Sequence, residues 1–153
     1  MRSRRHPPPP DVPPSTVVLD TNIALDLLVF DDPACRPLDA ALAGGAWRWI
    51  ATAAMRGEFA RVLGYPLIEA RLARIGRGAA EVLAEFDRRA QAVDTPGAAA
   101  GIPVCDDPDD QPFVDLAVAH RALLLSKDRA VLQLRRALAE RGVTVASAWP
   151  APA

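Results

Sequence analysis

The chain has 153 residues, of which 50% are hydrophobic and 24% are charged, values that are typical of a folded globular domain and not of a disordered chain. Eighteen Lys and Arg residues against nineteen Asp and Glu residues give a formal net charge of −1, which excludes a global attraction to nucleic acid and leaves that role to local basic patches. No apolar run is long enough for a membrane-spanning helix, so we expect a cytoplasmic protein without a membrane partner. Two cysteines, Cys35 and Cys105, are too few for a disulfide framework or a four-ligand zinc site.

The composition divides the chain into one domain and two tails. Residues 1–15 hold six of the fifteen prolines, four of them consecutive, behind three arginines. Because such a run fits neither a helix interior nor a central strand, we expect a disordered, basic and proline-rich tail. The same prolines stand where a signal peptide needs an apolar segment. Residues 16–149 form the expected single domain, and residues 150–153 a C-terminal tail.

Short apolar runs alternate with helical patterns along the domain. The β-branched run 16–19 predicts a buried strand, and three further strands are expected at 47–52, 123–126 and 143–145. Helical character is expected from residue 23 and over the ranges 53–64, 66–75, 78–92, 108–120 and 131–140. This alternation predicts an α/β fold with three layers, α/β/α, around a mainly parallel, Rossmann-like central sheet.

Two aspartates directly follow predicted strands. Asp20 comes after the run 16–19, and Asp128 comes two residues after the run 123–126. In an open parallel sheet, ligands bind beyond the carboxyl ends of the strands, so both side chains are candidates for a site at that edge. A structural role as a helix N-cap explains Asp20 equally well.

Glu58 lies on a predicted helix, three residues after Met55 and four before Val62. This spacing places its carboxylate near the packed side of the helix. A carboxylate buried without a partner is costly, so Glu58 needs a salt bridge to an arginine, hydrogen-bond donors or a bound cation.

Residues 105–115 contain five carboxylates in eleven positions. Asp107 and Pro108 suit a helix N-cap and first turn, whereas Asp110 shares a helical stripe with the core residues Phe113 and Ala117. We expect Asp110, Asp20 and Asp128 at one edge of the sheet with Glu58 reaching in from a neighbouring helix. Carboxylates crowded in this way repel one another unless a cation neutralises them, and ligand sets of oxygen alone select Mg²⁺ or Mn²⁺.

The order of these motifs resembles the PIN-domain family of metal-dependent nucleases. The matching segments, within residues 16–149, are Leu19-Asp20-Thr21-Asn22, Glu58 ahead of Val62-Leu63, Asp107-Pro108-Asp109-Asp110 and Leu124-Leu125-Ser126-Lys127-Asp128. The Cys-x-Asp-Pro-Asp-Asp element is similar to the VapC-like branch, described as putative toxin components of toxin–antitoxin systems. The resemblance implies a PIN-like fold and a metal-dependent endoribonuclease that cuts single-stranded RNA.

The resemblance also implies roles for individual residues. The catalytic, metal-binding quartet carries over onto Asp20, Glu58, Asp110 and Asp128, with Asp107 as a fifth metal ligand. Thr21 and Asn22 match positions that support the first aspartate by hydrogen bonding, and Ser126 is a further supporting residue. The implied cofactor is Mg²⁺ or Mn²⁺, and the implied partners are an RNA substrate, a cognate antitoxin and further copies of the chain.

RNA attraction has to come from local cations. Arg71, Arg74 and Arg77 recur every three residues and predict a basic helical stripe, with Lys127 beside Asp128 as a further candidate. The alternative for such a stripe is a solvated face balanced by acids.

Two other functions remain open from the sequence. The family often has an acid where this chain has Ala130 and a small residue where it has Lys127, so a catalytically weak or inactive module that acts through an antitoxin or self-association is one alternative. The other is a haloacid-dehalogenase-like phosphatase, which needs an acid at the position of Asn22.

Overall fold

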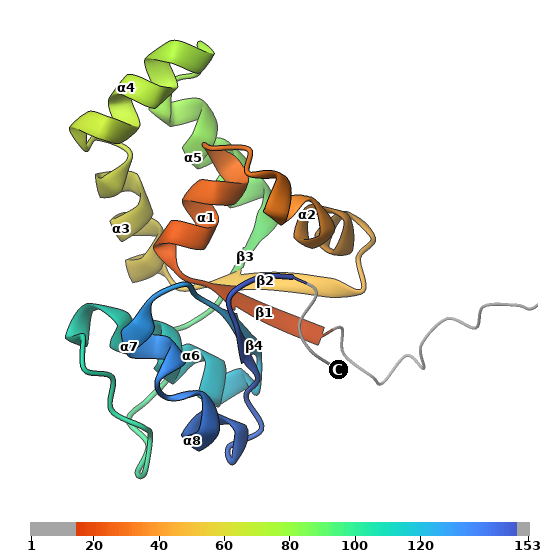
Figure 1. Ribbon diagram of the computed structural model, residues 1–153, viewed down its shortest axis with the longest axis vertical. Helices are drawn as coiled ribbons and strands as arrows, with labels where there is room; N and C mark the ends of the chain where they lie inside the picture. The colour runs from red at the N-terminus through yellow and green to blue at the C-terminus, as the bar shows by residue number, and fades with distance from the viewer. Residues whose placement is uncertain (1–14, 150–153) are drawn as a thin grey trace, which may run out of the picture.

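The structure is a computed structural model that describes residues 15–149 (Figure 1). The predicted tails, residues 1–14 and 150–153, therefore lie outside the described residues. Ser15, which the composition assigns to the N-terminal tail, is instead the first residue of strand β1 (Ser15–Leu19). Its backbone N–H donates to the carbonyl of Ala46 at 3.2 Å, which extends the pairing of β1 with the next strand by one residue.

The described residues form one five-stranded sheet in which every pair of neighbours is parallel. Its other strands are β2 (Trp47–Ala51), β3 (Ala90–Ala92), β4 (Leu123–Leu125) and β5 (Val145–Ala146). The spatial order is β3-β2-β1-β4-β5. The sheet thus extends from β1 in both directions. The carboxyl ends of the neighbouring strands β1 and β4 mark the topological switch point, where such sheets bind ligands.

Helices cover both faces of the sheet, which confirms the predicted three-layer α/β/α fold (Figure 1). On one side lie α1 (Thr21–Leu28), α2 (Arg36–Ala43), α3 (Ala53–Val62), α4 (Pro66–Ile75) and α5 (Ala79–Arg89). On the other lie α6 (Gln111–His120), α7 (Arg129–Leu132) and α8 (Arg135–Ala139). Two 3₁₀ turns, Pro33–Cys35 and Pro108–Asp110, precede α2 and α6. None of the helices described is both long and apolar enough to cross a membrane.

The core fixes the two central strands and the helix that carries Glu58. Val17, Val18 and Leu124 are completely buried, as expected for central strands covered on both faces. The ring centroids of Phe59 on α3 and Phe86 on α5 lie 4.9 Å apart. Because Phe59 is locked into this aromatic contact, its neighbour Glu58 is held at a fixed position on the wall above the sheet.

The structure differs from the sequence-based prediction at several element ends. The helix predicted over 78–92 ends at Arg89, and the last residues form edge strand β3, which pairs with β2. The helix predicted over 131–140 is split into α7 and α8, and the last strand is 145–146 instead of 143–145. The segment 36–43 forms α2, a helix that the patterns did not indicate.

Candidate functional site

Asp20 occupies the end of β1, at the switch point of the sheet. It is the N-cap of α1: one carboxylate oxygen, Oδ1, accepts from the backbone N–H of Ile23 at 2.8 Å. The other oxygen, Oδ2, accepts from the Ser126 hydroxyl at 2.5 Å. Asp20 is only 3% exposed, and burial raises its pKa, opposed by the hydrogen bonds from Ser126 and Ile23. The capping role and a place in the site are therefore compatible.

Asp128 faces Asp20 from the end of the neighbouring strand. Leu19 and Leu125 pair across β1 and β4, so the residues that follow them emerge side by side. The Ser126 hydroxyl accepts from the backbone N–H of Asp128 at 3.0 Å while it donates to Asp20. Ser126, which is fully buried, therefore links the two aspartates through a single oxygen atom.

Asp107 and Asp110 come from the 3₁₀ turn before α6. Asp107 is the N-cap of this turn and accepts from the backbone N–H of Asp109 at 3.0 Å. The helix predicted from residue 108 therefore begins as a 3₁₀ turn and becomes α-helical at Gln111. Asp110 precedes α6 but makes no side-chain capping bond, so its carboxylate is free to face the strand ends.

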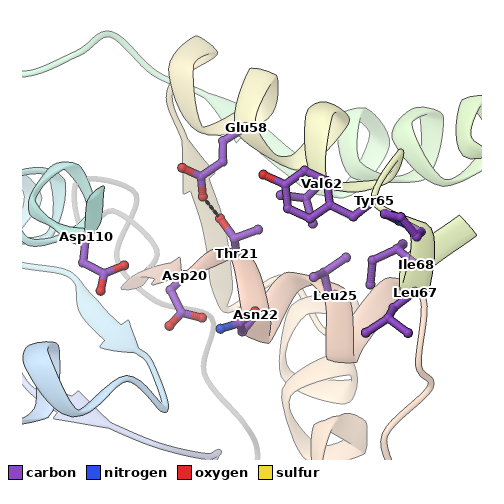
Figure 2. A pocket seen from close by; sticks show the side chains of 11 residues that line it. Asp20, Thr21, Asn22, Leu25, Glu58, Val62, Tyr65, Leu67, Ile68 and Asp110 are labelled. Atoms are coloured by element: carbon purple, nitrogen blue, oxygen red, sulfur yellow. Dashed lines mark hydrogen bonds between the residues drawn. The ribbon is translucent and has the colours of Figure 1, made fainter. Parts of the chain in front are cut away.

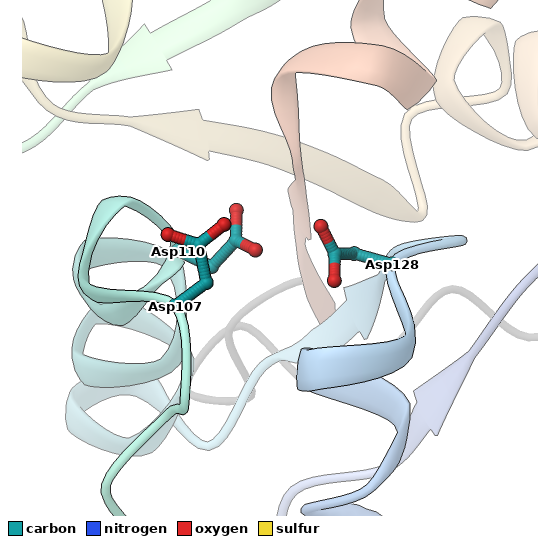
Figure 3. Close-up of side chains that lie close together, drawn as sticks. All are labelled: Asp107, Asp110 and Asp128. Atoms are coloured by element: carbon teal, nitrogen blue, oxygen red, sulfur yellow. The ribbon is translucent and has the colours of Figure 1, made fainter.

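Three aspartates meet at this place (Figure 3). Asp107, Asp110 and Asp128 each offer a carboxylate oxygen, and these atoms all lie within 4.8 Å of one another. Figure 3 shows Asp107 and Asp110 facing Asp128 across the end of the sheet. We call these three residues the aspartate triad. Within the triad and Asp20, no carboxylate has a Lys, Arg or His partner among residues 15–149.

Mutual repulsion in the triad is strongest at Asp110. Its pKa is raised to about 7, first by burial, then by the neighbouring carboxyl group of Asp128 and by the negative charges of Asp128, Asp107 and Asp20. Its Oδ2 atom is buried and has no hydrogen-bond partner among the described residues. A buried carboxylate oxygen without a donor is costly, and a hard divalent cation satisfies it. The residues present therefore fit Mg²⁺ or Mn²⁺, both of which prefer oxygen ligands.

Glu58 lies apart from the triad, on the opposite wall. It is half-buried and accepts a short hydrogen bond from the Thr21 hydroxyl, so the salt bridge considered for it is absent from the described residues. Thr21 thus supports Glu58 and not Asp20, because its position in the first turn of α1 directs its hydroxyl toward α3. Asn22 is exposed and lines the same cleft.

These side chains border a cleft of about 530 Å³. Figure 2 shows Asp20, Asp110 and Glu58 at one end of it. The other end is apolar and is formed by α1, α3 and the start of α4, with the lining residues Leu25, Val62, Tyr65, Pro66, Leu67 and Ile68. The cleft is large enough to hold part of an organic ligand directly beside the carboxylates.

The predicted basic stripe does not form. Helix α4 ends at Ile75, and Gly76 adopts a left-handed conformation (φ 71°), which turns Arg77 away from the helical repeat. Arg77 donates to the carbonyl of Leu28 at 3.1 Å and pairs with Glu85 at 2.9 Å. Arg71 donates to the carbonyl of Phe30 at 3.2 Å. Two of the three arginines of the predicted stripe therefore make structural contacts, and of the three only Arg74 is exposed.

Lys127 and Ala130 also have local roles. The ammonium group of Lys127 pairs with Asp26 on α1, which raises the pKa of the lysine and leaves it directed at a protein carboxylate. The backbone N–H of Ala130 donates to the carboxylate of Asp128 at 2.8 Å. Position 130 thus contributes a backbone N–H, which every residue except proline supplies.

Two features of the site were missed in the sequence. Gln111 accepts from the Cys105 backbone N–H at 2.6 Å and donates to the Pro103 carbonyl at 3.0 Å, which holds the loop that carries Asp107 and Asp110. The apolar end of the cleft was also missed. Its signal was present as Val62, Tyr65 and Leu67, large side chains that follow Glu58 where one predicted helix ends and the next begins.

A comparison with protein families gives one match. The family described as PIN domain matches residues 16–130, a range that includes Asp20, Glu58, the aspartate triad and Ser126. A comparison with curated proteins gives no match.

Proposed function

The chain belongs to the PIN-domain family, and we propose that it is a Mg²⁺- or Mn²⁺-dependent endoribonuclease that hydrolyses phosphodiester bonds of single-stranded RNA. PIN domains are generally nucleases, and the fold and an acidic cluster at the strand ends agree with this class. The observation that carries the proposal is the aspartate triad: three carboxylates within 4.8 Å of one another, without a cationic partner among the described residues.

We propose Asp107, Asp110 and Asp128 as the metal ligands, with Asp20 beside them. When bound, a divalent ion activates water for in-line attack and stabilises charge on the leaving oxygen. Ser126 orients Asp20 and the Asp128 backbone, as outer-shell donors do in metal sites. Glu58 lies across the cleft from Asp110 and is held by Thr21, so a phosphodiester placed between the two walls meets carboxylates from both sides.

The nuclease requires no other nucleophile. His120, the one histidine among the described residues, is exposed at the end of α6. Cys105 is buried below the triad, and burial raises the pKa of its thiol, which keeps it protonated and unreactive. Water is therefore the nucleophile that the site supports.

The toxin role and the cognate antitoxin are part of the proposal and rest on the Cys-x-Asp-Pro-Asp-Asp element at residues 105–110. A toxin nuclease has to be held inactive by a partner until it is released. The proposal accordingly includes an antitoxin as partner, self-association of the chain and residues 16–149 as the single nuclease domain.

The test is cleavage of single-stranded RNA by the purified full chain with Mg²⁺ or Mn²⁺. Wild type is compared with Asp20→Asn and Asp128→Asn, which keep the shape of each side chain but remove its charge. Asp106→Asn is the matched control, because Asp106 is exposed and is not a member of the triad. We expect cleavage by wild type and the control, and a loss of at least about 100-fold in both other variants, in line with loss of charge stabilisation at a reacting group.

Cleavage that is equal in all four proteins would contradict the proposal. Absence of cleavage together with absence of carboxylate-dependent Mn²⁺ binding in calorimetry would favour the alternative, an inactive module that acts only through protein contacts.

A further inference from the structure

The apolar end of the cleft continues directly from its acidic end. Val62 lies one helical turn, about 6 Å, beyond Glu58 on the same face of α3. Tyr65 follows at the start of α4 and lines the same cleft. Figure 2 shows these side chains gathered with Leu25 and Leu67 at the end of the cleft away from Asp110. A ligand held at the carboxylates therefore extends naturally over this surface.

Two side chains of this surface are exposed although they are large and apolar. Tyr65 is 48% exposed and Leu67 is 85% exposed. Single exposed apolar residues are common, but here they line one concave surface next to a candidate active site, an arrangement typical of ligand-binding clefts. The surface therefore favours an occupant with a flat or apolar face.

The charges of the cleft indicate which occupant fits. Three acids and no Lys or Arg of the described residues line it, so the walls of the cleft offer no cation to an RNA phosphate. Phosphate contacts supply most of the affinity of nonspecific nucleic-acid binding. Where they are lacking, stacking of bases on aromatic rings is the remaining source of affinity, and it tolerates any sequence.

Arg61 is a cation on the same helix as Glu58 and Val62. It is exposed on α3, three residues after Glu58 and four before Tyr65. The Tyr65 hydroxyl beside it raises the pKa of the Arg61 guanidinium, and the charges of Glu58 and Asp109 add to this effect. Arg61 therefore neighbours Tyr65 without being one of the residues that line the cleft.

We propose that the apolar end of the cleft is a nucleobase subsite, in which a base of the RNA next to the scissile phosphate stacks on the Tyr65 ring while Arg61 contacts the adjoining phosphate. This proposal rests on the proposed function, because it states how the same cleft holds single-stranded RNA. It names Tyr65 and Arg61 as substrate-binding residues outside the carboxylate cluster.

The test removes the ring and the base separately. Binding of a short single-stranded RNA to the full chain is measured by fluorescence anisotropy in Ca²⁺, for the intact RNA and for a set of RNAs that each lack one base. For wild type, we expect loss of one particular base to weaken binding about 5- to 150-fold, the range for one stacked base. Tyr65→Ala weakens binding of intact RNA by a similar factor and makes binding insensitive to that base.

Further variants separate stacking from folding. Tyr65→Trp keeps a flat ring and retains binding, whereas Val104→Ala, at an exposed apolar residue outside the cleft, leaves binding unchanged. Arg61→Gln lowers the slope of log Kd against log salt concentration by about 0.7, the value for one phosphate contact of a single strand.

Other outcomes overturn the proposal. The proposal is wrong if wild type binds no RNA or if Tyr65→Ala binds intact RNA within about twofold of wild type. It is also wrong if the loss of affinity from Tyr65→Ala and the loss from base removal multiply, because the ring and the base would then act independently. A dimer of wild type that Tyr65→Ala dissociates, with RNA binding unchanged, would identify the surface as an interface between copies. RNA binding that follows the expected pattern without metal-dependent cleavage would instead refute only the nuclease function.

Discussion

The carboxylates in and beside the cleft form two groups that differ in how they are satisfied. Asp107, Asp110 and Asp128 crowd together at the strand ends, and one buried oxygen of Asp110 has no donor among the described residues. Glu58, on the opposite wall, accepts a hydrogen bond from Thr21 and lies outside this cluster. The crowded group therefore needs a cation, whereas Glu58 is already satisfied without one. Position on the sheet edge, and not acidity alone, determines which carboxylates are crowded together.

The largest effect is expected for metal binding by Asp110→Asn. The substitution removes the charge of the one triad member whose buried oxygen has no donor. Isothermal calorimetry with Mn²⁺ should show one tight site in wild type and an affinity at least about 100-fold lower in the variant, more than is typical for loss of an outer-shell partner. Undiminished Mn²⁺ affinity would contradict the assignment of Asp110 as a ligand.

A smaller effect is expected for Ser126→Ala, which tests the link between Asp20 and Asp128. The substitution leaves Oδ2 of Asp20 without its donor and the Asp128 N–H without its acceptor. We expect a loss of about 1–3 kcal/mol in the free energy of unfolding and about 10- to 100-fold in Mn²⁺ affinity. Denaturant titration and calorimetry measure the two losses. Ser126→Thr, which keeps the hydroxyl, should recover part of the metal affinity if the hydroxyl is the cause.

The stability of the metal-free protein should fall as the pH rises. The pKa of Asp110 is about 7 in the folded chain, against 3.8 for an ordinary carboxyl, so folding favours the protonated form. The protonated carboxyl of Asp110 makes its full contribution to the free energy of unfolding below about pH 4, and this contribution is lost as the pH rises through about 7. We expect Asp110→Asn to be more stable than wild type at pH 8, by about 1 kcal/mol because Asp110 is partly solvated, and the difference to vanish at pH 4. Thermal unfolding with a chelator at both pH values measures this, and a larger difference at pH 4 would contradict it.

The smallest effect on metal affinity is expected for Glu58→Gln. Glu58 is outside the triad, and glutamine keeps an oxygen that accepts from Thr21. Mn²⁺ affinity should change by less than about fivefold, while RNA cleavage falls because one wall of the cleft loses its charge. A loss of Mn²⁺ affinity equal to that of Asp110→Asn would remove the distinction between the two groups.

Much of the fold follows from local sequence patterns. The strands β1, β2 and β4 are apolar runs, and burial on both faces is what such runs favour. Strand β3 is Ala-Gln-Ala, which has no intrinsic β preference. Its extended conformation comes from pairing with β2. The local sequence pattern therefore predicted that the preceding helix continues through these three residues. Helix α2 is short and follows a proline-containing turn. Its apolar face can be recognised only from its contact with the sheet that it covers.

The site was predictable where chain geometry alone determines it. Asp20 and Asp128 follow parallel strands, so their proximity follows from topology. The orientation of Glu58 depends on a tertiary contact, the hydrogen bond donated by Thr21 of α1. The contacts that Arg77 makes beyond the end of α4, with Leu28 and Glu85, are also tertiary. The apolar end of the cleft needs three helices to exist and has no periodic signal of its own.

The contacts of Arg71 and Arg77 bear on how the cleft responds to a ligand. Both guanidinium groups reach from α4, or just beyond it, to backbone carbonyls at and after the end of α1. These hydrogen bonds hold α4 at a set distance from the end of α1 before any ligand binds. A preorganised opening loses little entropy when it is filled, and a ligand must adapt its own shape to it.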